Sequence, residues 1–133
     1  MANADRAYSK QYNGIERRVL MDALDASQSL VWFDCAGVIV DANTNALKLF
    51  SYVVGDILKQ DYFTLCGGRT KLNLADKREW ARIADGKLCL TERTYTSNDG
   101  REIWSSVNFA ALHNEDGSTR RVLAMFVDLS RFA

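Results

Sequence analysis

The chain has 133 residues, of which 47% are hydrophobic, and its 17 basic and 17 acidic side chains cancel at neutral pH. A chain of this length and hydrophobicity can bury one core, so we expect a single folded domain. The balanced charge lacks the basic excess of proteins that bind nucleic acids or membrane surfaces, so we expect neither partner.

The cysteines and the hydropathy indicate where such a domain would work. Cys35, Cys66 and Cys89 are odd in number, far apart and not in CxxC spacing, so they predict neither a disulfide framework nor a zinc site. The sequence has no apolar run long enough to span a membrane, and its N-terminal MANADRAYSKQYNG lacks the apolar stretch of a signal peptide. We therefore expect a cytoplasmic segment without membrane contact.

The first third of the chain predicts a helix and a hairpin. Residues 5–26 contain no proline and place apolar side chains at helical spacing, with an interruption near Asn13 and Gly14. These apolar side chains are Ile15, Val19, Leu20, Ala23 and Leu24. The runs SLVWFD (29–34) and GVIVDAN (37–43) follow as two short strands, since a CAG turn separates them.

The middle of the chain returns to helical spacing in short pieces. Asn43 is a suitable N-cap for TNALKLF (44–50), and LADKREWARIADG (74–86) predicts a longer helix that ends at a glycine. We expect TLCGGRTKLN (64–73) to be a loop. Three strands at 88–97, 101–112 and 120–130 then follow, joined by the turns NDG and NEDG. The order predicts an α+β domain, in which a five-stranded antiparallel sheet carries short helices between its second and third strands and has an N-terminal flanking helix.

Catalytic patterns are missing from the sequence. The single histidine, His113, lies beside Asn114 and Glu115 in a turn, with no nucleophile at motif spacing. No GxSxG, HExxH, phosphate-binding or kinase motif occurs. We therefore predict no catalytic residue, no metal site and no enzymatic activity.

Several stretches together resemble a PAS domain over about residues 22–130. They are DALDASQSLVWFDCAGVIVDANTNALKLFSYVVGDIL, W...ADGK, DGREIW and NEDGSTRRVLAMFVDLS. Family members end their fifth strand with an Asp-Ile-Thr-like tripeptide at the junction to a helical linker, and Asp128-Leu129-Ser130 is similar to it. The resemblance implies the PAS fold, with a helical cap or dimerisation segment at 1–26, the PAS domain at 27–130, and the start of a linker to an output domain at 131–133.

Within the family, the chain resembles the PAS sensor domains of bacterial chemoreceptors and of aerotaxis and redox sensors. The residues that carry this likeness are Asp41-Ala42-Asn43, Trp80 with Asp85-Gly86, and DGREIW. It implies a sensory input domain of a bacterial signal-transduction protein, such as a methyl-accepting chemotaxis protein, that binds a small ligand or cofactor and relays its state through the sheet and flanking helices. The alternative is a cofactor-free PAS module that dimerises subunits and relays strain, with its pocket filled by its own side chains.

Strand alternation and comparison with family members place one set of side chains inside the sheet. The cofactor-binding residues that the resemblance implies are Phe33, Trp80, Arg93, Tyr95, Ser105, Val107 and Phe126. Polar groups on this face need partners, which a heteroatom-rich ligand would supply. The alternative for Arg93 is a pair with Glu92 or Asp99 at the rim. Trp80 either stacks on an isoalloxazine ring or is a core residue, the more frequent role of an aromatic at helical spacing.

Three cofactor chemistries can be compared with the residues. A light-driven flavin adduct of the LOV type needs a cysteine where DYFTLCGG has Tyr62, with Cys66 displaced, so we do not expect it. Heme PAS domains usually take a histidine from a helix beside the pocket, whereas His113 lies at a hairpin turn, which disfavours heme. FAD as a redox cofactor remains, and CGGRT (66–70) would either hold its anionic tail or be a flexible loop.

The other sheet face would carry an apolar patch, called here the outer-face patch. Its members are Trp32, Trp104, Leu123, Met125 and Val127. Such a patch is too large to leave in water. Either the N-terminal helix of the same chain folds back over it, or a homodimer covers it in which that helix packs against a partner subunit, and the two arrangements are compatible. The residues expected at the dimer or signal interface are Val19, Trp32, Trp104, Leu123, Met125 and Asp128.

Overall fold

The computed structural model describes residues 14–67 and 74–130 of the chain. Within these ranges it contains five helices and five strands. In chain order they are α2 (Gly14–Ser27), β1 (Ser29–Asp34), β2 (Ile39–Ala42), α3 (Thr44–Phe50), α4 (Val54–Ile57), α5 (Tyr62–Leu65), α6 (Leu74–Ala84), β3 (Leu90–Thr96), β4 (Glu102–His113) and β5 (Thr119–Asp128).

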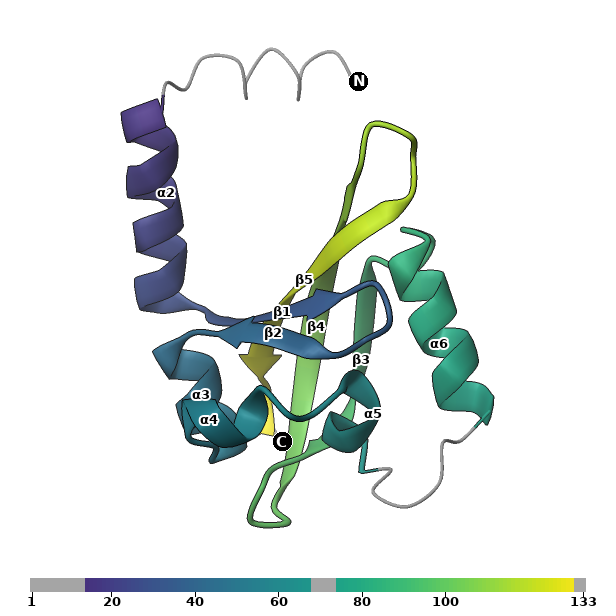
Figure 1. Ribbon diagram of the computed structural model, residues 1–133. Helices are drawn as coiled ribbons and strands as arrows, with labels where there is room; N and C mark the ends of the chain where they lie inside the picture. Colours follow the sequence, from purple (N-terminus) through teal and green to yellow (C-terminus); the bar gives the residue numbers. More distant parts are fainter. Residues whose placement is uncertain (1–13, 68–73, 131–133) are drawn as a thin grey trace.

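The strands of the described residues form one antiparallel sheet in the order β2-β1-β5-β4-β3. The first and last strands of the chain therefore lie side by side in its centre, with Ser29 opposite Phe126 and Trp32 opposite Leu123. Helices α3 to α6, inserted between β2 and β3, pack on the sheet, while α2 stands apart (Figure 1). This confirms the predicted α+β fold with its N-terminal flanking helix.

Local capping explains where the short helices begin and end. Asn43 has an extended backbone, and its side-chain oxygen accepts a hydrogen bond from the backbone N–H of Ala46 at 2.9 Å, which starts α3. The left-handed conformation of Ser51 ends that helix. Asp61 caps α5 in the same way by accepting from the backbone N–H of Thr64 at 2.9 Å. The prediction of loop from residue 64 was therefore wrong for Thr64 and Leu65, because the Asp61 cap makes them the last residues of a one-turn helix.

Strand alternation, together with the resemblance to the family, assigned the two faces of the sheet correctly. The side chains expected inside from β1, β4 and β5 are buried, whereas Trp32 and Trp104 are only half-buried. The buried members are Val31, Phe33, Ile103, Ser105, Val107, Phe109, Val122, Ala124 and Phe126. The main core thus lies between the sheet and helices α3, α5 and α6.

Helix α2 does not cover the sheet of its own subunit. It begins at Gly14 and projects away from the sheet, and none of its residues is buried (Figure 1). The expectation that this helix folds back over the outer-face patch is therefore wrong, while the part of the expected helix at residues 5–13 lies outside the described residues. None of the described helices combines the length and the hydropathy needed to cross a bilayer.

Candidate functional site

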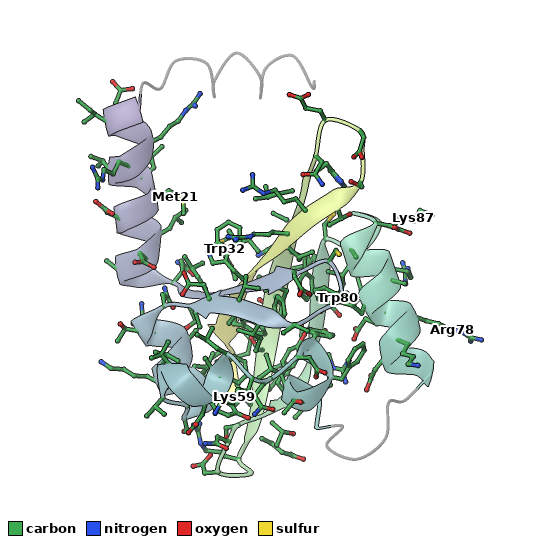
Figure 2. All side chains as sticks on the ribbon, in the orientation of Figure 1. Met21, Trp32, Lys59, Arg78, Trp80 and Lys87 are labelled. Carbon is green, nitrogen blue, oxygen red and sulfur yellow. The ribbon has the colours of Figure 1, made fainter. Side chains whose placement is uncertain are left out.

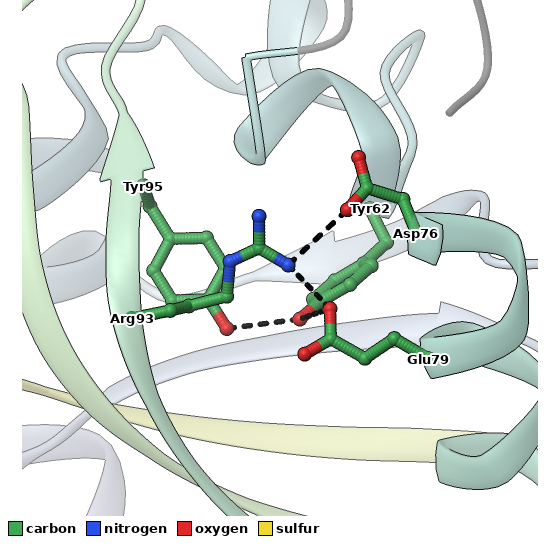
Figure 3. Close-up of polar contacts among 5 residues, drawn as sticks. All are labelled: Tyr62, Asp76, Glu79, Arg93 and Tyr95. Atoms are coloured by element: carbon green, nitrogen blue, oxygen red, sulfur yellow. Dashed lines mark hydrogen bonds and ion pairs between the residues drawn. The ribbon is translucent and has the colours of Figure 1, made fainter. Parts of the chain in front are cut away.

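A polar cluster joins α5 and α6 to β3 at the edge of the core (Figure 3). Its buried part is a pair of tyrosine hydroxyls, Tyr62 from α5 and Tyr95 from β3, which lie 2.9 Å apart. Tyr62 donates its own proton to the carboxylate of Glu79 at 3.2 Å, so Tyr95 donates to the Tyr62 oxygen. The hydrogen bonds therefore run from the core outward to α6.

Arg93 closes this cluster at the rim. Its guanidinium forms ion pairs with Asp76, at 3.4 Å, and with Glu79 on α6, and it lies 5.5 Å from the centre of the Tyr95 ring (Figure 3). The expected alternative partners, Glu92 and Asp99, are wrong. They are engaged elsewhere, since Glu92 accepts from the Trp104 indole at 2.9 Å and Asp99 bonds to Ser97. Arg93 instead points across the strand toward α6, where two carboxylates one helical turn apart face it.

Burial sets the protonation states in this cluster. Burial, followed by the neighbouring Tyr95, raises the pKa of Tyr62 well above its ordinary value, and burial also raises the pKa of Tyr95. Burial raises the pKa of the adjacent Cys66 thiol from 9.0 to about 12. Both phenols and the thiol are therefore neutral at neutral pH, and the formal charges of the cluster are those of Arg93 and its two carboxylates.

One set of metal-ligating side chains occurs here among the described residues. The ligand atoms of Cys66, Asp76 and Glu79 all lie within 4.8 Å of one another. The guanidinium of Arg93 already occupies both carboxylates, and the thiol is protonated at neutral pH. A metal ion would have to displace Arg93 and deprotonate Cys66, so this set does not fit a resident metal.

The residues expected to bind a cofactor lie on the inner face, but they pack against one another. Trp80 is 5% exposed, and its ring centre lies 5.2 Å from that of Phe33 and 5.2 Å from that of Tyr62. Its indole N–H donates to the carbonyl of Cys35 at 3.0 Å. Across the core, the ring centre of Phe126 lies 5.3 Å from that of Tyr95. Trp80 is thus a core residue, as its helical spacing favoured.

The polar groups of the inner face also find partners in the chain. The buried hydroxyl of Ser105 lies 2.9 Å from the carbonyl of Val127, and Tyr95 is paired with Tyr62. Among the described residues, no buried side-chain nitrogen or oxygen lacks a hydrogen-bond partner. An isoalloxazine ring does not fit this interior unless Tyr62 or Trp80 moves, because their rings occupy the space between sheet and helices. Of the CGGRT stretch, residues 68–70 lie outside the described residues.

Sequence reasoning missed the acidic partners of the cluster. Asp76 and Glu79 were predicted only as part of a longer helix, although their i, i+3 spacing puts both on one side of α6. Tyr62 was considered only as the residue at the LOV cysteine position, yet it is fully buried and links the core to Glu79. The useful signal was Arg93 on the inner side of a strand, because a half-buried arginine requires an acidic partner on the element that covers it.

The residues expected at an interface lie in three places. Trp32, Trp104, Leu123 and Met125 share the outer side of the sheet and are half-buried. Val19 lies on the projecting α2. Asp128 lies at the end of β5, where it lines a surface depression with the α2–β1 connection, residues 27–29.

Two asparagines connect α2 to the rest of the domain, and we call them the asparagine clamp. The side-chain nitrogen of Asn43 donates to the carbonyls of Asp25, at 3.1 Å, and Gln28, at 2.7 Å. That of Asn45 lies 3.1–3.2 Å from the carbonyls of Asp25, Ala26 and Gln28. Asn43 also accepts from the backbone N–H of Leu30 at 3.0 Å. The clamp therefore holds the last turn of α2 against the starts of β1 and α3.

Comparison with known proteins gives consistent matches. A family model described as a PAS domain matches residues 21–131. The biofilm dispersion protein BdlA of Pseudomonas aeruginosa is 29% identical over 109 residues, which are 82% of this chain and 26% of that protein. The chain thus spans about a quarter of the length of the curated relative it matches.

Solved structures share the fold. A domain of the sensory box sensor histidine kinase/response regulator from Geobacter sulfurreducens has a TM-score of 0.65 and 23% identity, covering 87% of this chain and 97% of that one. An RNA-binding light-oxygen-voltage receptor has a TM-score of 0.74 and 18% identity, covering 91% of this chain and 35% of that one. At these identities the structural matches show the fold alone.

Proposed function

Because the chain belongs to the PAS domain family, we propose that it is a sensory and relay domain of a larger bacterial signalling protein of the chemoreceptor type, acting as a homodimer in the cytosol. It passes a change in core packing to the elements that join it to an output domain. The three free thiols Cys35, Cys66 and Cys89 suit a reducing compartment.

One observation carries this proposal: the inner face is complete without a cofactor. Ser105 and Tyr95, which we expected to need a ligand, bond to Val127 and Tyr62 instead. Aromatic rings from the sheet, α3, α5 and α6 fill the space between them. Such a core responds as one packed unit, because a shift of one ring must displace its neighbours.

The entry and exit of the chain supply a route for the signal. The end of α2 and the end of β5 lie beside one another, since Ser29 pairs with Phe126 and Asp128 lines the same depression as Ser27. Phe126 reaches from this junction into the core, where its ring centre lies 5.0 Å from that of Phe50. A change in core packing is thereby transmitted to both flanking segments.

A small-ligand sensor is the second candidate, and the rim of the cluster favours it. The side chains of Arg93, Asp76 and Glu79 keep 26%, 15% and 19% of their surface exposed and approach from two different elements. A polar ligand that bonds to these groups would compete with the bridge between α6 and β3. FAD could be the ligand of such a sensor only if the aromatic rings of the core rearrange to make room for it.

An absorption spectrum and native mass spectrometry of the freshly purified protein separate the two candidates. For the relay domain we expect no flavin or heme bands and a native mass of twice that of the polypeptide, with no added increment. Flavin absorption with FAD released on denaturation would overturn the cofactor-free proposal. A colourless mass increment that disappears on Arg93→Met would instead support the small-ligand sensor.

A further inference from the structure

A polar hollow of about 270 Å³ lies where three connections between elements meet α5. The α3–α4 connection contributes Tyr52, the α4–α5 connection Gln60, α5 itself Thr64, and the turn between β3 and β4 Asn98. That turn lies below α4 and α5 in Figure 1. We call this depression the amide hollow, after the carboxamides of Gln60 and Asn98 that line it.

The two carboxamides have hydrogen-bonding capacity that the chain does not use. The side chain of Asn98 has no hydrogen-bond partner among the described residues, and only its backbone N–H is bonded, to the carbonyl of Phe50 at 2.8 Å. The Gln60 side-chain nitrogen lies 3.5 Å from the carbonyl of Asp56, which is at the limit of a hydrogen bond. The Thr64 hydroxyl donates to Asp61 at 3.1 Å and keeps lone pairs with which to accept. Donors and acceptors from separate segments therefore converge on the hollow. Side chains at the surface, among them the labelled Lys59 next to Gln60, are drawn in Figure 2.

The lining selects for an uncharged ligand. None of the four lining side chains carries a charge, so a charged group would lose water there without gaining an ion pair from the lining. The acids next to Gln60 and Asn98 in the chain, Asp61 and Asp99, are bonded to Thr64 and Ser97. A carboxamide pairs best with a group that presents a donor beside an acceptor, as an amide or a lactam does.

We propose that the amide hollow binds a small uncharged molecule with an amide or lactam edge, and that this molecule is the input of the relay domain. Sites for drug-sized ligands usually measure about 300–1,000 Å³, so this hollow suits a smaller molecule. Because Asn98 is exposed, the hollow is open to solvent, and its ligand exchanges readily and is lost on purification. The inference rests on the relay role of the proposed function and adds to it a binding site outside the aromatic core.

The hollow is connected to the core through the backbone of the β3–β4 turn. The N–H of Asn98 donates to the carbonyl of Phe50, the last residue of α3. The ring centre of Phe50 lies 5.0 Å from that of Phe126 and 6.4 Å from that of Tyr95. A ligand that draws Asn98 toward Gln60 therefore shifts the chain at Phe50, and the close-packed rings pass this shift to Phe126 on β5.

Nuclear magnetic resonance tests the site directly, because the side-chain amides of Gln60 and Asn98 give signals of their own. The ¹⁵N-labelled protein is titrated with three molecules that share a pyridine ring: uncharged nicotinamide, anionic nicotinate and the cationic pyridylmethylamine. Uracil, with its lactam edges, is a second uncharged probe. We expect nicotinamide and uracil to shift both side-chain signals saturably and the backbone amide signal of Phe126 with them. The two charged analogues should bind at least about tenfold more weakly than nicotinamide.

Substitutions show whether the shifts come from the hollow. Asn98→Ala and Gln60→Ala each remove one carboxamide and should weaken nicotinamide binding about three- to tenfold, the usual effect of one neutral hydrogen bond. Asn108→Ala, at an exposed asparagine of β4 outside the hollow, is the matched control and should bind like wild type. Gln60→Glu keeps the shape of the side chain but adds a negative charge, so it should move the preference toward pyridylmethylamine. Far-UV circular dichroism and the midpoint of thermal unfolding check that each variant is folded.

Three outcomes overturn the inference. If neither nicotinamide nor uracil shifts the two side-chain signals at millimolar concentration, the hollow is not a site for amides. If the charged analogues bind as well as nicotinamide, or if both alanine variants of the hollow bind like wild type, the carboxamides do not select the ligand. If the ligand binds but the Phe126 signal does not move, the hollow is not the input of the relay. All three leave the relay function standing, whereas a flavin bound in the core would overturn that function whatever the hollow binds.

Discussion

The hydroxyls of Tyr62 and Tyr95 lie 2.9 Å apart inside the core, and the Tyr62 hydroxyl extends this pair to the charged rim by donating to Glu79. The pair joins α5 to β3, and Glu79 joins both to α6. A buried polar chain of this kind is stable only while every member has its partner. It therefore makes the position of α6 depend on side chains deep in the core.

The stability losses from removing the two tyrosine hydroxyls one at a time should add up to more than the loss from removing both together. Tyr62→Phe leaves the Tyr95 hydroxyl buried without its acceptor, so we expect a loss of about 1–3 kcal/mol in the free energy of unfolding. In Tyr62→Phe/Tyr95→Phe no hydroxyl is left unpaired at this position, so the double variant should lose less than the sum of the single losses. Urea unfolding of wild type, both singles and the double measures the coupling. Strictly additive losses would show that the two hydroxyls do not interact in solution.

The inner face could be predicted from alternation in the strands together with the resemblance to the family. A period of two put Val107 and Phe109 on one face and Trp104 on the other, and the resemblance to the family then identified the inner face, where Phe33, Val107 and Phe126 are indeed buried. The partners of the polar residues could not be predicted in the same way. Arg93 meets Asp76 and Glu79 because α6 packs beside β3, and that juxtaposition is tertiary. A strand pattern shows that a polar group points inward, but not which element covers it.

The direction in which α2 projects could not be predicted from the sequence either. The apolar spacing of Ile15 and Val19 predicts a helix with one side to bury, whether against its own sheet or another chain. Asn43 and Asn45 set the direction of α2, because their side chains bond to backbone carbonyls that are distant in sequence. Asn43 was predicted as a helix cap, and this role is confirmed, but its bonds to α2 were not foreseen.

The cysteines should differ in reactivity. Cys35 and Cys89 are exposed, whereas burial raises the pKa of Cys66 to about 12. Because the thiolate is the reactive form, iodoacetamide at neutral pH should alkylate Cys35 and Cys89 first and leave Cys66 unmodified in the folded protein. Peptide mass spectrometry over time, with a sample unfolded in urea as the control, assigns the sites. Modification of Cys66 as rapid as that of Cys89 would contradict its burial.

The same shift predicts an alkaline loss of stability. The folded protein holds the Cys66 proton up to about pH 12, while the unfolded chain releases it near pH 9. The folded state therefore binds more protons in this window, so the free energy of unfolding falls as pH rises from about 9 toward 12. Cys66→Ala removes this contribution, and its stability should decline less steeply than that of wild type. Urea unfolding of both proteins at pH 8 to 11 measures this decline. If the free energy of unfolding fell equally steeply with pH in wild type and Cys66→Ala, Cys66 would not contribute, and the buried tyrosines would account for the whole decline.

Two substitutions of Asn43 separate its cap from its clamp. Asn43→Asp keeps an oxygen that accepts from Ala46 and Leu30, but it replaces the donor to Asp25 and Gln28 by a second acceptor. Asn43→Ala loses both. We expect Asn43→Ala to lower the free energy of unfolding by about 1–3 kcal/mol, and Asn43→Asp to lower it less.

Both variants should free α2 to the same extent. Hydrogen exchange of the α2 amides should accelerate in Asn43→Asp and Asn43→Ala alike, while exchange of the α3 amides should accelerate only in Asn43→Ala. Asn45→Ala is the matched control for the clamp, because Asn45 bonds to the α2 carbonyls without capping α3. Unchanged α2 exchange in all three variants would show that the clamp does not set the position of this helix.

Substitution of Gly37 tests the packing of Trp80, because Gly37 has a positive φ and also lies against the Trp80 indole. Its φ of +93° lies in the left-handed region, and a Cβ added to it would come within 3.2 Å of the Trp80 indole. Gly117 has a φ of +88° with open space around it, so Gly117→Ala measures the backbone cost alone, about 1–2 kcal/mol. Gly37→Ala should cost at least about 1 kcal/mol more, since the rings of Phe33 and Tyr62 keep the indole from moving away.

If Trp80 were instead a mobile ring that leaves the core to admit a cofactor, the two glycine variants would lose equal stability. Tryptophan fluorescence of the Trp32→Phe/Trp104→Phe background, which keeps only Trp80, would then be the same with and without Gly37→Ala.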